Sequence, residues 1–281
     1  MTADVFLAVL AAAMMHAGWN ALIKIRLDPF LSISLMSFGM GAISLVCLPF
    51  VAVPAGWTWL WILLSVALHT GYKLFLVSAY RAGDLGQVYP LARGTAPLLT
   101  ACGSAVLIGE ILSISTMVAI AVLCLGILLM SVRGASSAAT LRRDTVLYAL
   151  GTSVFIAFYT LVDGVGGRSA PGAMSYTAWL FVIDGFSMGL LCLGLRGWAA
   201  LDVMLPAWHR GLGTGALSLG GYGIIIWAMT QAPIAAVAAL RESSILFALV
   251  LSSLMLKERL TPWRITAAAL ILAGVVGLRI G

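Results

Sequence analysis

The chain has 281 residues, of which 62% are hydrophobic and only 9% are charged, with a formal net charge of +6. A soluble surface needs roughly a quarter to a third of its residues charged, so this composition argues against a soluble enzyme, a nucleic-acid binder and a disordered chain. Lipid is the remaining solvent. Because a spanning helix uses about 20 apolar residues, the chain is long enough for about ten spans.

Long apolar runs separated by short polar segments follow one another from end to end of the chain. The first run carries Asp4 where a signal peptide has basic residues, and it continues past His16, so we expect it to be a spanning helix. Pro29 and Pro262 are typical of helix starts, because the missing proline N–H costs nothing there. The pattern predicts an all-α membrane protein with ten spans: 3–23, 29–53, 57–80, 84–108, 113–132, 144–165, 172–195, 207–229, 233–256 and 261–280.

The longest polar segment, residues 133–144, lies near the middle of the chain and suggests a duplication. A shift of 148 positions (241 minus 93) aligns Arg93 with Arg241 and Glu110 with Glu258. We expect the two glutamates to have a structural role at equivalent span ends. Five spans in each half would place the second half upside down, as in the inverted repeats of many secondary transporters. The predicted domains are a first five-helix repeat over 1–134, a cytoplasmic-type linker over 135–143 and a second five-helix repeat over 144–281.

Basic residues are distributed unevenly between the predicted loops. Of the 16 Lys and Arg in the chain, only Arg168 and Arg279 fall in loops on the side of the termini, whereas most of the others follow odd-numbered spans. Since basic loops face the cytoplasm, the count predicts that both termini lie outside.

Three segments resemble the EamA-type transporters of the drug/metabolite transporter superfamily. They are His-Ala-Gly-Trp-Asn at 16–20 with the following Lys24, the stretch 79–97 with its Tyr-Pro-Leu-Ala-Arg-Gly, and the matched junctions at 109–113 and 257–261. The resemblance covers the whole chain. It implies ten spans in two inverted halves, transport of amino acids, nucleotide sugars, other metabolites or drugs, and cytoplasmic termini, the reverse of the orientation that the charge count predicts.

Ionisable side chains inside lipid are costly and normally face a cavity or a partner. Arg93 and Arg241 occupy equivalent places in the two halves and could face one central cavity, where a guanidinium binds a carboxylate or phosphate through two parallel hydrogen bonds. The alternative is that each arginine pairs with the protein itself. Glu242, the neighbour of Arg241, is a candidate for such a pair and also for sensing protons.

His16, Trp19 and Asn20 lie three and four residues apart and therefore share one face of the first span. They are candidates to bind substrate, and His16 could also couple transport to protons. Tyr159 and Asp163 offer a corresponding group in the sixth span, with Asp163 as a second proton site. The alternatives are helix packing for the first group and an interfacial position near the span end for Asp163.

His69, Tyr72 and Lys73 share a face of the third span, where Lys73 is too deep to reach the interface and either pairs with Asp184 or lines the cavity. Aromatic residues could complete the wall of the cavity, although packing and interfacial belts are the usual use of such residues. The candidate substrate-binding residues are Arg93, Arg241, His16, Trp19, Asn20, Tyr72, Lys73, Tyr89, Tyr159, Tyr222 and Trp227. The candidate proton-coupling residues are His16, Asp163 and Glu242.

The sequence thus predicts a secondary transporter, an exporter of a small polar or zwitterionic metabolite such as an amino acid or a related compound. Two alternatives stay open. An exporter of drugs or organic cations in the same fold would need a deep unpaired carboxylate, and an intramembrane lipid-modifying enzyme would need clustered carboxylates or histidines.

The sequence contains no phosphate-binding loop, dinucleotide fingerprint or metal-ligand cluster, so we expect no catalysis, cofactor or metal. The expected partners are the substrate and the lipid bilayer, with no nucleic acid. We expect a multi-pass protein of the inner (plasma) membrane, as a monomer or homodimer.

Overall fold

The structure is a computed structural model of the chain, and it describes residues 1–22, 27–82, 85–132, 143–256 and 261–281. Side chains at 21, 80–82, 85–89, 131–132 and 254–256 lie outside this description. The helices of the first half are α1 (Ala3–Leu22), α2 (Pro29–Cys47), α3 (Thr58–Ala82), α4 (Leu85–Gly103) and α5 (Ile114–Val132), with short turns η1 (Leu48–Phe50) and η2 (Ser104–Ile108). The second half contains α6 (Arg143–Ser169), α7 (Ala173–Arg196), α8 (Ala199–Met204), η3 (Leu205–Ala207), α9 (Trp208–Gln231), α10 (Ile234–Arg241), α11 (Ser244–Leu256) and α12 (Pro262–Ile280).

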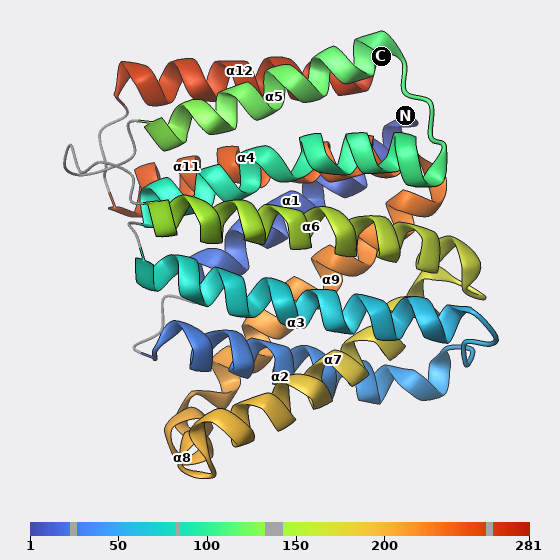
Figure 1. Cartoon of the computed structure of the whole chain (residues 1–281), viewed down its shortest axis with the longest axis vertical. Coiled ribbons are helices and arrows are strands. Elements are labelled where there is room, and N and C mark those ends of the chain that lie inside the picture. Colours follow the sequence, from blue (N-terminus) through green and yellow to red (C-terminus); the bar gives the residue numbers. More distant parts are fainter. Residues whose placement is uncertain (23–26, 83–84, 133–142, 257–260) are drawn as a thin grey trace.

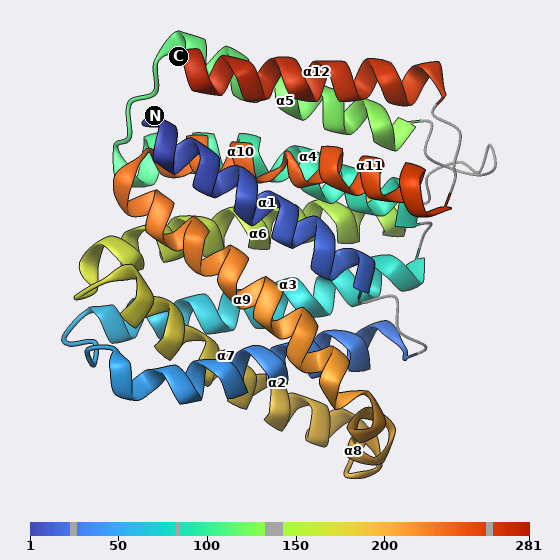
Figure 2. The ribbon, with the colours of Figure 1, turned by 180° about the vertical axis from the view of Figure 1, so that it is seen from behind.

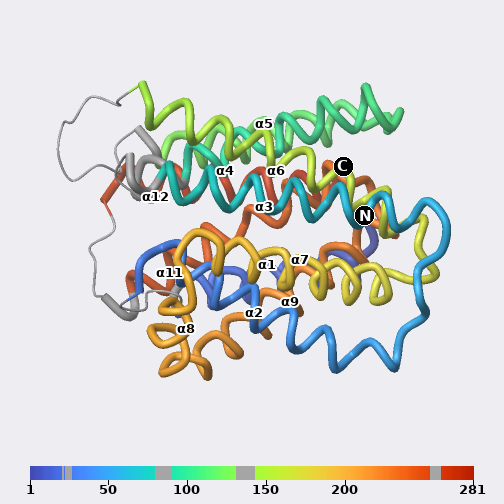
Figure 3. The backbone as a smooth tube through the Cα atoms, turned by 60° about the horizontal axis from the view of Figure 1, so that its bottom comes forward, coloured from blue at the N-terminus to red at the C-terminus, as the bar shows by residue number. Residues whose placement is uncertain are grey.

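The described part of the chain is helical and contains no strand, and its long helices run side by side between the two ends of the bundle (Figures 1 and 3). Nine stretches of it are long and apolar enough to cross a membrane, and Ile114–Met130 of α5 is a tenth, shorter apolar helix. The prediction of an all-α membrane protein is therefore confirmed.

Several helix starts follow from the local sequence. Asp28 accepts hydrogen bonds from the backbone N–H groups of Phe30 and Leu31, so its side chain caps α2 in front of Pro29. Thr261 caps α12 in front of Pro262 in the same way. These caps hold both helices at the starts that the prolines predicted.

The second and the ninth predicted spans differ clearly from the structure. The second was expected to reach residue 53, but α2 ends at Cys47, because Pro49 lacks the N–H that a longer helix would use and a 3₁₀ turn follows instead. The ninth was expected to be one helix over 233–256, but it is divided into α10 and α11 at Glu242 and Ser243. There the N–H groups of both residues bond to carbonyls only three residues back.

The two halves pack with the symmetry of an inverted repeat. Helix α2 packs on α7 and α5 on α12, so each of these helices meets its own counterpart, and the contact of α3 with α6 is repeated by that of α9 with α1. Helices α1 and α6 run in opposite directions across the bundle, and both termini lie at the end opposite α8 (Figures 1 and 2). Two inverted halves therefore enclose one interior.

Close glycine contacts bring α9 against α2. A Cβ atom at Gly215 of α9 would lie 2.8 Å from the carbonyl carbon of Gly39, too close for the two backbones to stay where they are. Gly213, two residues earlier on the same helix, has no neighbouring atom within 4 Å of such a Cβ.

The variant Gly215→Val should destabilise the protein by about 1–3 kcal/mol, the usual cost of overpacking, because a backbone rather than a flexible side chain would have to move. Gly213→Val is the matched control and should leave the stability unchanged. The measurement is the apparent melting temperature of the purified protein in detergent. Equal melting temperatures for the two variants would contradict the close approach of α2 and α9.

Candidate functional site

A cavity of about 80 Å³ lies inside the bundle, lined by side chains from both halves. Its walls come from α1, α2, α3 and α4 of the first half and from α6, α7, α9 and α10 of the second. Eight of the predicted site residues line it: His16, Trp19, Tyr72, Lys73, Arg93, Tyr159, Tyr222 and Arg241.

Arg93 and Arg241 reach the cavity from equivalent helices and share one carboxylate. Arg93 Nε lies 2.7 Å from Glu242 Oε2, and Arg241 Nη2 lies 3.5 Å from Glu242 Oε1. Adjacent residues of one helix do not face each other, but Glu242 lies in the break after α10, where the turn brings it to its neighbour. Both predicted possibilities are thus realised, since the arginines line the cavity and also pair with the protein.

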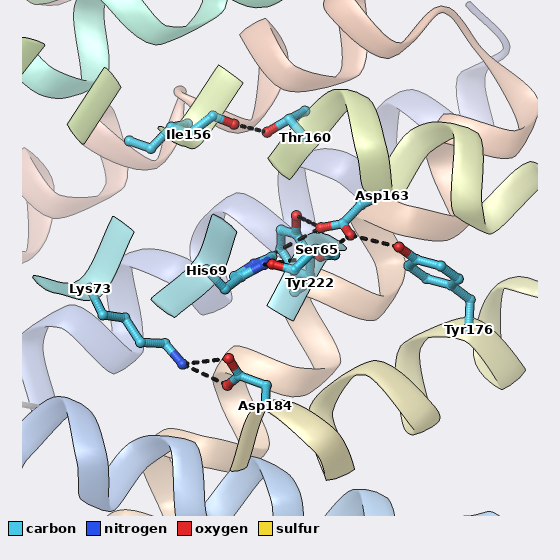
Figure 4. Close-up of polar contacts among 9 residues, drawn as sticks. All are labelled: Ser65, His69, Lys73, Ile156, Thr160, Asp163, Tyr176, Asp184 and Tyr222. Atoms are coloured by element: carbon cyan, nitrogen blue, oxygen red, sulfur yellow. Dashed lines mark hydrogen bonds and ion pairs between the residues drawn. The ribbon is translucent and has the colours of Figure 1, made fainter. Parts of the chain in front are cut away.

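Helix α3 presents Ser65, His69 and Lys73 on one face, because the three residues are spaced by four. Lys73 Nζ donates to both oxygens of the Asp184 carboxylate, at 2.8 and 2.6 Å (Figure 4). It also donates to Ser37 Oγ at 2.9 Å. Lys73 and Asp184 are both buried and both line the cavity. Lys73 therefore both pairs with Asp184 and lines the cavity, the two alternatives that the sequence left open.

Asp163 of α6 is the acceptor of a buried network. Its Oδ1 accepts hydrogen bonds from Ser65 Oγ at 2.5 Å and from the Tyr176 hydroxyl at 3.0 Å, and its Oδ2 accepts one from Tyr222 at 2.6 Å (Figure 4). His69 Nε2 lies 3.9 Å from Oδ2. The predicted alternative of an interfacial Asp163 is wrong, since α6 continues to Ser169 and the residue is 0% exposed.

The charges buried in the described part of the chain balance. The cations are Lys73, Arg93 and Arg241, and the carboxylates are Asp163, Asp184 and Glu242. An isolated ion in a medium of low dielectric is very costly. A ligand that enters the cavity therefore has to be close to neutral itself, or to be accompanied by a compensating charge.

Some predicted site residues lie elsewhere. Asn20 does not line the cavity, since its side-chain amide turns back to donate to the His16 carbonyl at 2.9 Å. Trp227 is 38% exposed and lines a separate apolar groove between α2, α7 and α9, on another face of its helix from Tyr222. The side chain of Tyr89 lies outside the described residues.

Sequence reasoning missed Ser65 and Tyr176 as members of the buried network. Ser65 could have been found from its spacing of four residues from His69, which places both on one helix face. Tyr176 lies in an apolar helix with no comparable pattern, and its role follows only from the packing of α7 against α6.

Each end of the bundle is closed by a partly exposed ion pair. At the end with the termini, Arg168 Nη2 lies 2.7 Å from Glu110 Oε1, and the same carboxylate accepts from the N–H of Ile234, the first residue of α10. At the opposite end Arg196 lies 3.2 Å from Asp28. Glu110 thus closes a span end as expected, whereas Glu258 lies outside the described residues.

Comparison with known proteins relates the chain to one family. The profile of the EamA-like transporter family matches residues 5–132 and again residues 144–280. A solved structure described as "Crystal structure of protein" has a TM-score of 0.77 and 18% sequence identity, and the match covers 100% of this chain and 98% of that one. At this identity the likeness shows the fold alone. The comparison with curated proteins gave no match.

The buried pair of Lys73 and Asp184 is expected to behave non-additively. Lys73→Met or Asp184→Leu alone should destabilise the protein by about 3–5 kcal/mol, because each leaves a charge without its partner, whereas the double variant should recover most of the loss. Melting temperatures of the three variants in detergent measure this. Additive losses would show that the two side chains do not depend on each other.

Proposed function

The chain belongs to the EamA-like transporter family, whose profile matches both of its halves, and from this premise we propose a secondary transporter of a small zwitterionic metabolite such as an amino acid. Members of the family are multi-pass membrane transporters. The proposal adds the class of substrate, the groups that bind it and the way in which the cavity opens. We also propose the inner (plasma) membrane as its location.

The observation that carries the proposal is the carboxylate shared by two arginines from equivalent positions in the inverted halves. Glu242 pairs with both Arg93 and Arg241, and these two arginines line the cavity. Two guanidiniums form a strong site for a carboxylate, so a substrate carboxylate can take the place that Glu242 holds in this structure. Glu242 is then an internal competitor, and a proton on it would also free the arginines.

Charge balance favours a zwitterion over an ion. The three buried cations and three buried carboxylates leave no net charge for a charged ligand to neutralise. A zwitterion adds a carboxylate for the arginines and an ammonium group for the displaced Glu242, and thereby keeps the interior neutral. An organic cation would add one uncompensated positive charge, which is costly in such an environment.

The size and lining of the cavity favour a small metabolite. Its volume of about 80 Å³ is well below the roughly 300–1,000 Å³ of sites for drug-sized ligands. Trp19, Tyr72, Tyr159 and Tyr222 supply aromatic surface beside the arginines. Aromatic faces can pack against an apolar side chain of the substrate or attract its ammonium group.

We propose that alternating access arises when one half rocks against the other, as in other inverted-repeat carriers. The pairs Glu110–Arg168 and Asp28–Arg196 lie at opposite ends and are partly exposed, and exposed ion pairs contribute only about 0–1 kcal/mol each. They can therefore open in turn while the buried pairs persist. A secondary carrier follows the combined gradients, so we propose export whenever the metabolite accumulates in the cytoplasm.

The first test compares three ligands with one side chain: an amino acid, its amide and its decarboxylated amine. Purified protein in liposomes loaded with the unlabelled amino acid should exchange it for external labelled amino acid, and excess amide or amine should not compete, because neither carries a carboxylate. Inhibition and uptake of the amine would favour the organic-cation exporter. Absence of exchange across a panel of amino acids would overturn the proposal.

The second test is the variant Arg241→Ala, which should lower the initial rate of this exchange at least tenfold, corresponding to about 1.4 kcal/mol of lost interaction. Arg210→Ala removes an exposed arginine of α9 and should leave the rate unchanged. A single symmetric peak in size-exclusion chromatography checks that both variants are folded. A folded Arg241→Ala protein with full activity would contradict a substrate carboxylate at this arginine.

A further inference from the structure

The geometry points to a proton-binding site formed by His69 and Asp163, which communicates with the cavity arginines through Tyr222. The inference rests on the proposed function, since it names protons as the ion that drives this transporter. It concerns residues outside the arginine site, and it is testable by proton binding as well as by transport.

The hydrogen bonds of Asp163 define its state in this structure. Ser65, Tyr176 and Tyr222 each donate a hydroxyl proton to its carboxylate, so both oxygens act as acceptors. A carboxylate that only accepts is ionised. The interior thus holds a negative charge that is stabilised by three neutral donors, and Nε2 of the His69 ring lies 3.9 Å from its Oδ2.

The neighbours of the His69 ring determine which of its nitrogens carries the proton. Its Nδ1 lies 3.1 Å from Ser65 Oγ and 3.0 Å from the Ser65 carbonyl oxygen. The hydroxyl proton of Ser65 is already donated to Asp163, so both neighbours of Nδ1 are acceptors and Nδ1 carries the proton. In the neutral ring Nε2 then has a free lone pair, and it lies 3.9 Å from Asp163 Oδ2. The pair can therefore take up one further proton, either at His69 Nε2 or at the Asp163 carboxylate.

Aromatic rings pack around His69, which also lines the cavity. His69 stacks on Tyr159 with ring centroids 4.2 Å apart, and it meets the edges of Phe181 and Tyr222 at 6.2 and 5.7 Å. The pair interacts directly with Lys73 of α3, Tyr176 and Asp184 of α7, and Tyr222 of α9, and His69 stacks on Tyr159 of α6. The same cavity is also lined by His16 of α1, Arg93 of α4 and Arg241 of α10, and Glu242 pairs with both arginines. Lys73 and Asp184 neutralise each other, so a proton gained by the pair changes the net charge of this interior.

Tyr222 connects the pair to the proposed substrate site. Its hydroxyl donates to Asp163 Oδ2 at 2.6 Å, and its ring lies 5.9 Å from the guanidinium carbon of Arg241. A proton that binds Asp163 at Oδ2 competes with the hydroxyl of Tyr222 for the same oxygen. Proton binding therefore alters the contact of Tyr222 with Arg241, which couples the two sites in both directions.

Proton binding is measured on purified protein without any substrate. In infrared difference spectra the carbonyl band of a protonated carboxylic acid should grow as the pH is lowered, and this component should be lost in Asp163→Asn. The control Asp202→Asn, which changes an exposed carboxylate of α8, should leave it intact. His69→Gln should move the midpoint of the titration. A titration that is the same in Asp163→Asn and in the wild type would overturn the site.

Coupling is measured in liposomes with an imposed pH gradient. The wild type should accumulate labelled amino acid in response to the gradient. Tyr222→Phe keeps the aromatic ring of the cavity, and in this variant the infrared titration should persist while the ratio of gradient-driven accumulation to exchange without a gradient falls. If the wild type showed no exchange, the proposed substrate would be wrong. The infrared titration would still test the proton site, because it needs no substrate. Gradient-driven accumulation by folded Asp163→Asn would overturn the coupling role.

Discussion

Charge neutrality in a lipid-embedded interior is the constraint on which the rest of this structure depends. Three cations and three carboxylates are buried in the described part of the chain, and none of them can lose its compensation cheaply. The pairs join different helices, as Lys73 of α3 joins Asp184 of α7 and Arg93 of α4 joins Glu242 at the end of α10. The pairs thereby connect helices that meet around the cavity, and in the proposed mechanism a substrate exchanges its charges with those of the protein.

The inverted repeat explains why such a cavity exists. Equivalent helices approach each other across the pseudo-symmetry axis, so equivalent residues from the two halves can face one space. Arg93 and Arg241 are such a pair, yet the carboxylate between them comes from one half only. The two arginines are therefore related by the repeat, whereas the carboxylate between them is not, and this asymmetry would give the proposed zwitterion a preferred orientation.

Much of this was predictable from the sequence. The scarcity of charge predicted the membrane, the shift of 148 positions (241 minus 93) matched the two arginines, and the spacing of His69 and Lys73 placed both on one face. The break after α10 was not predictable, because residues 234–253 contain no glycine or proline and tertiary contacts of Glu242 set the break. Trp227 was misplaced because aromatic character does not tell which face of α9 meets the cavity. Tyr176 was missed because a tyrosine in an apolar helix reveals its acceptor only after packing.

In the proposed mechanism, Glu242 occupies the place of a substrate carboxylate between the two arginines. The most direct measurement is the affinity of purified Glu242→Gln for an amino acid, compared with the wild type by isothermal titration calorimetry. This variant removes the competing charge and keeps both arginines. It should therefore bind the amino acid about tenfold more tightly, which corresponds to about 1.4 kcal/mol of binding free energy. A folded variant that binds the amino acid no better than the wild type, or not at all, would contradict the claim.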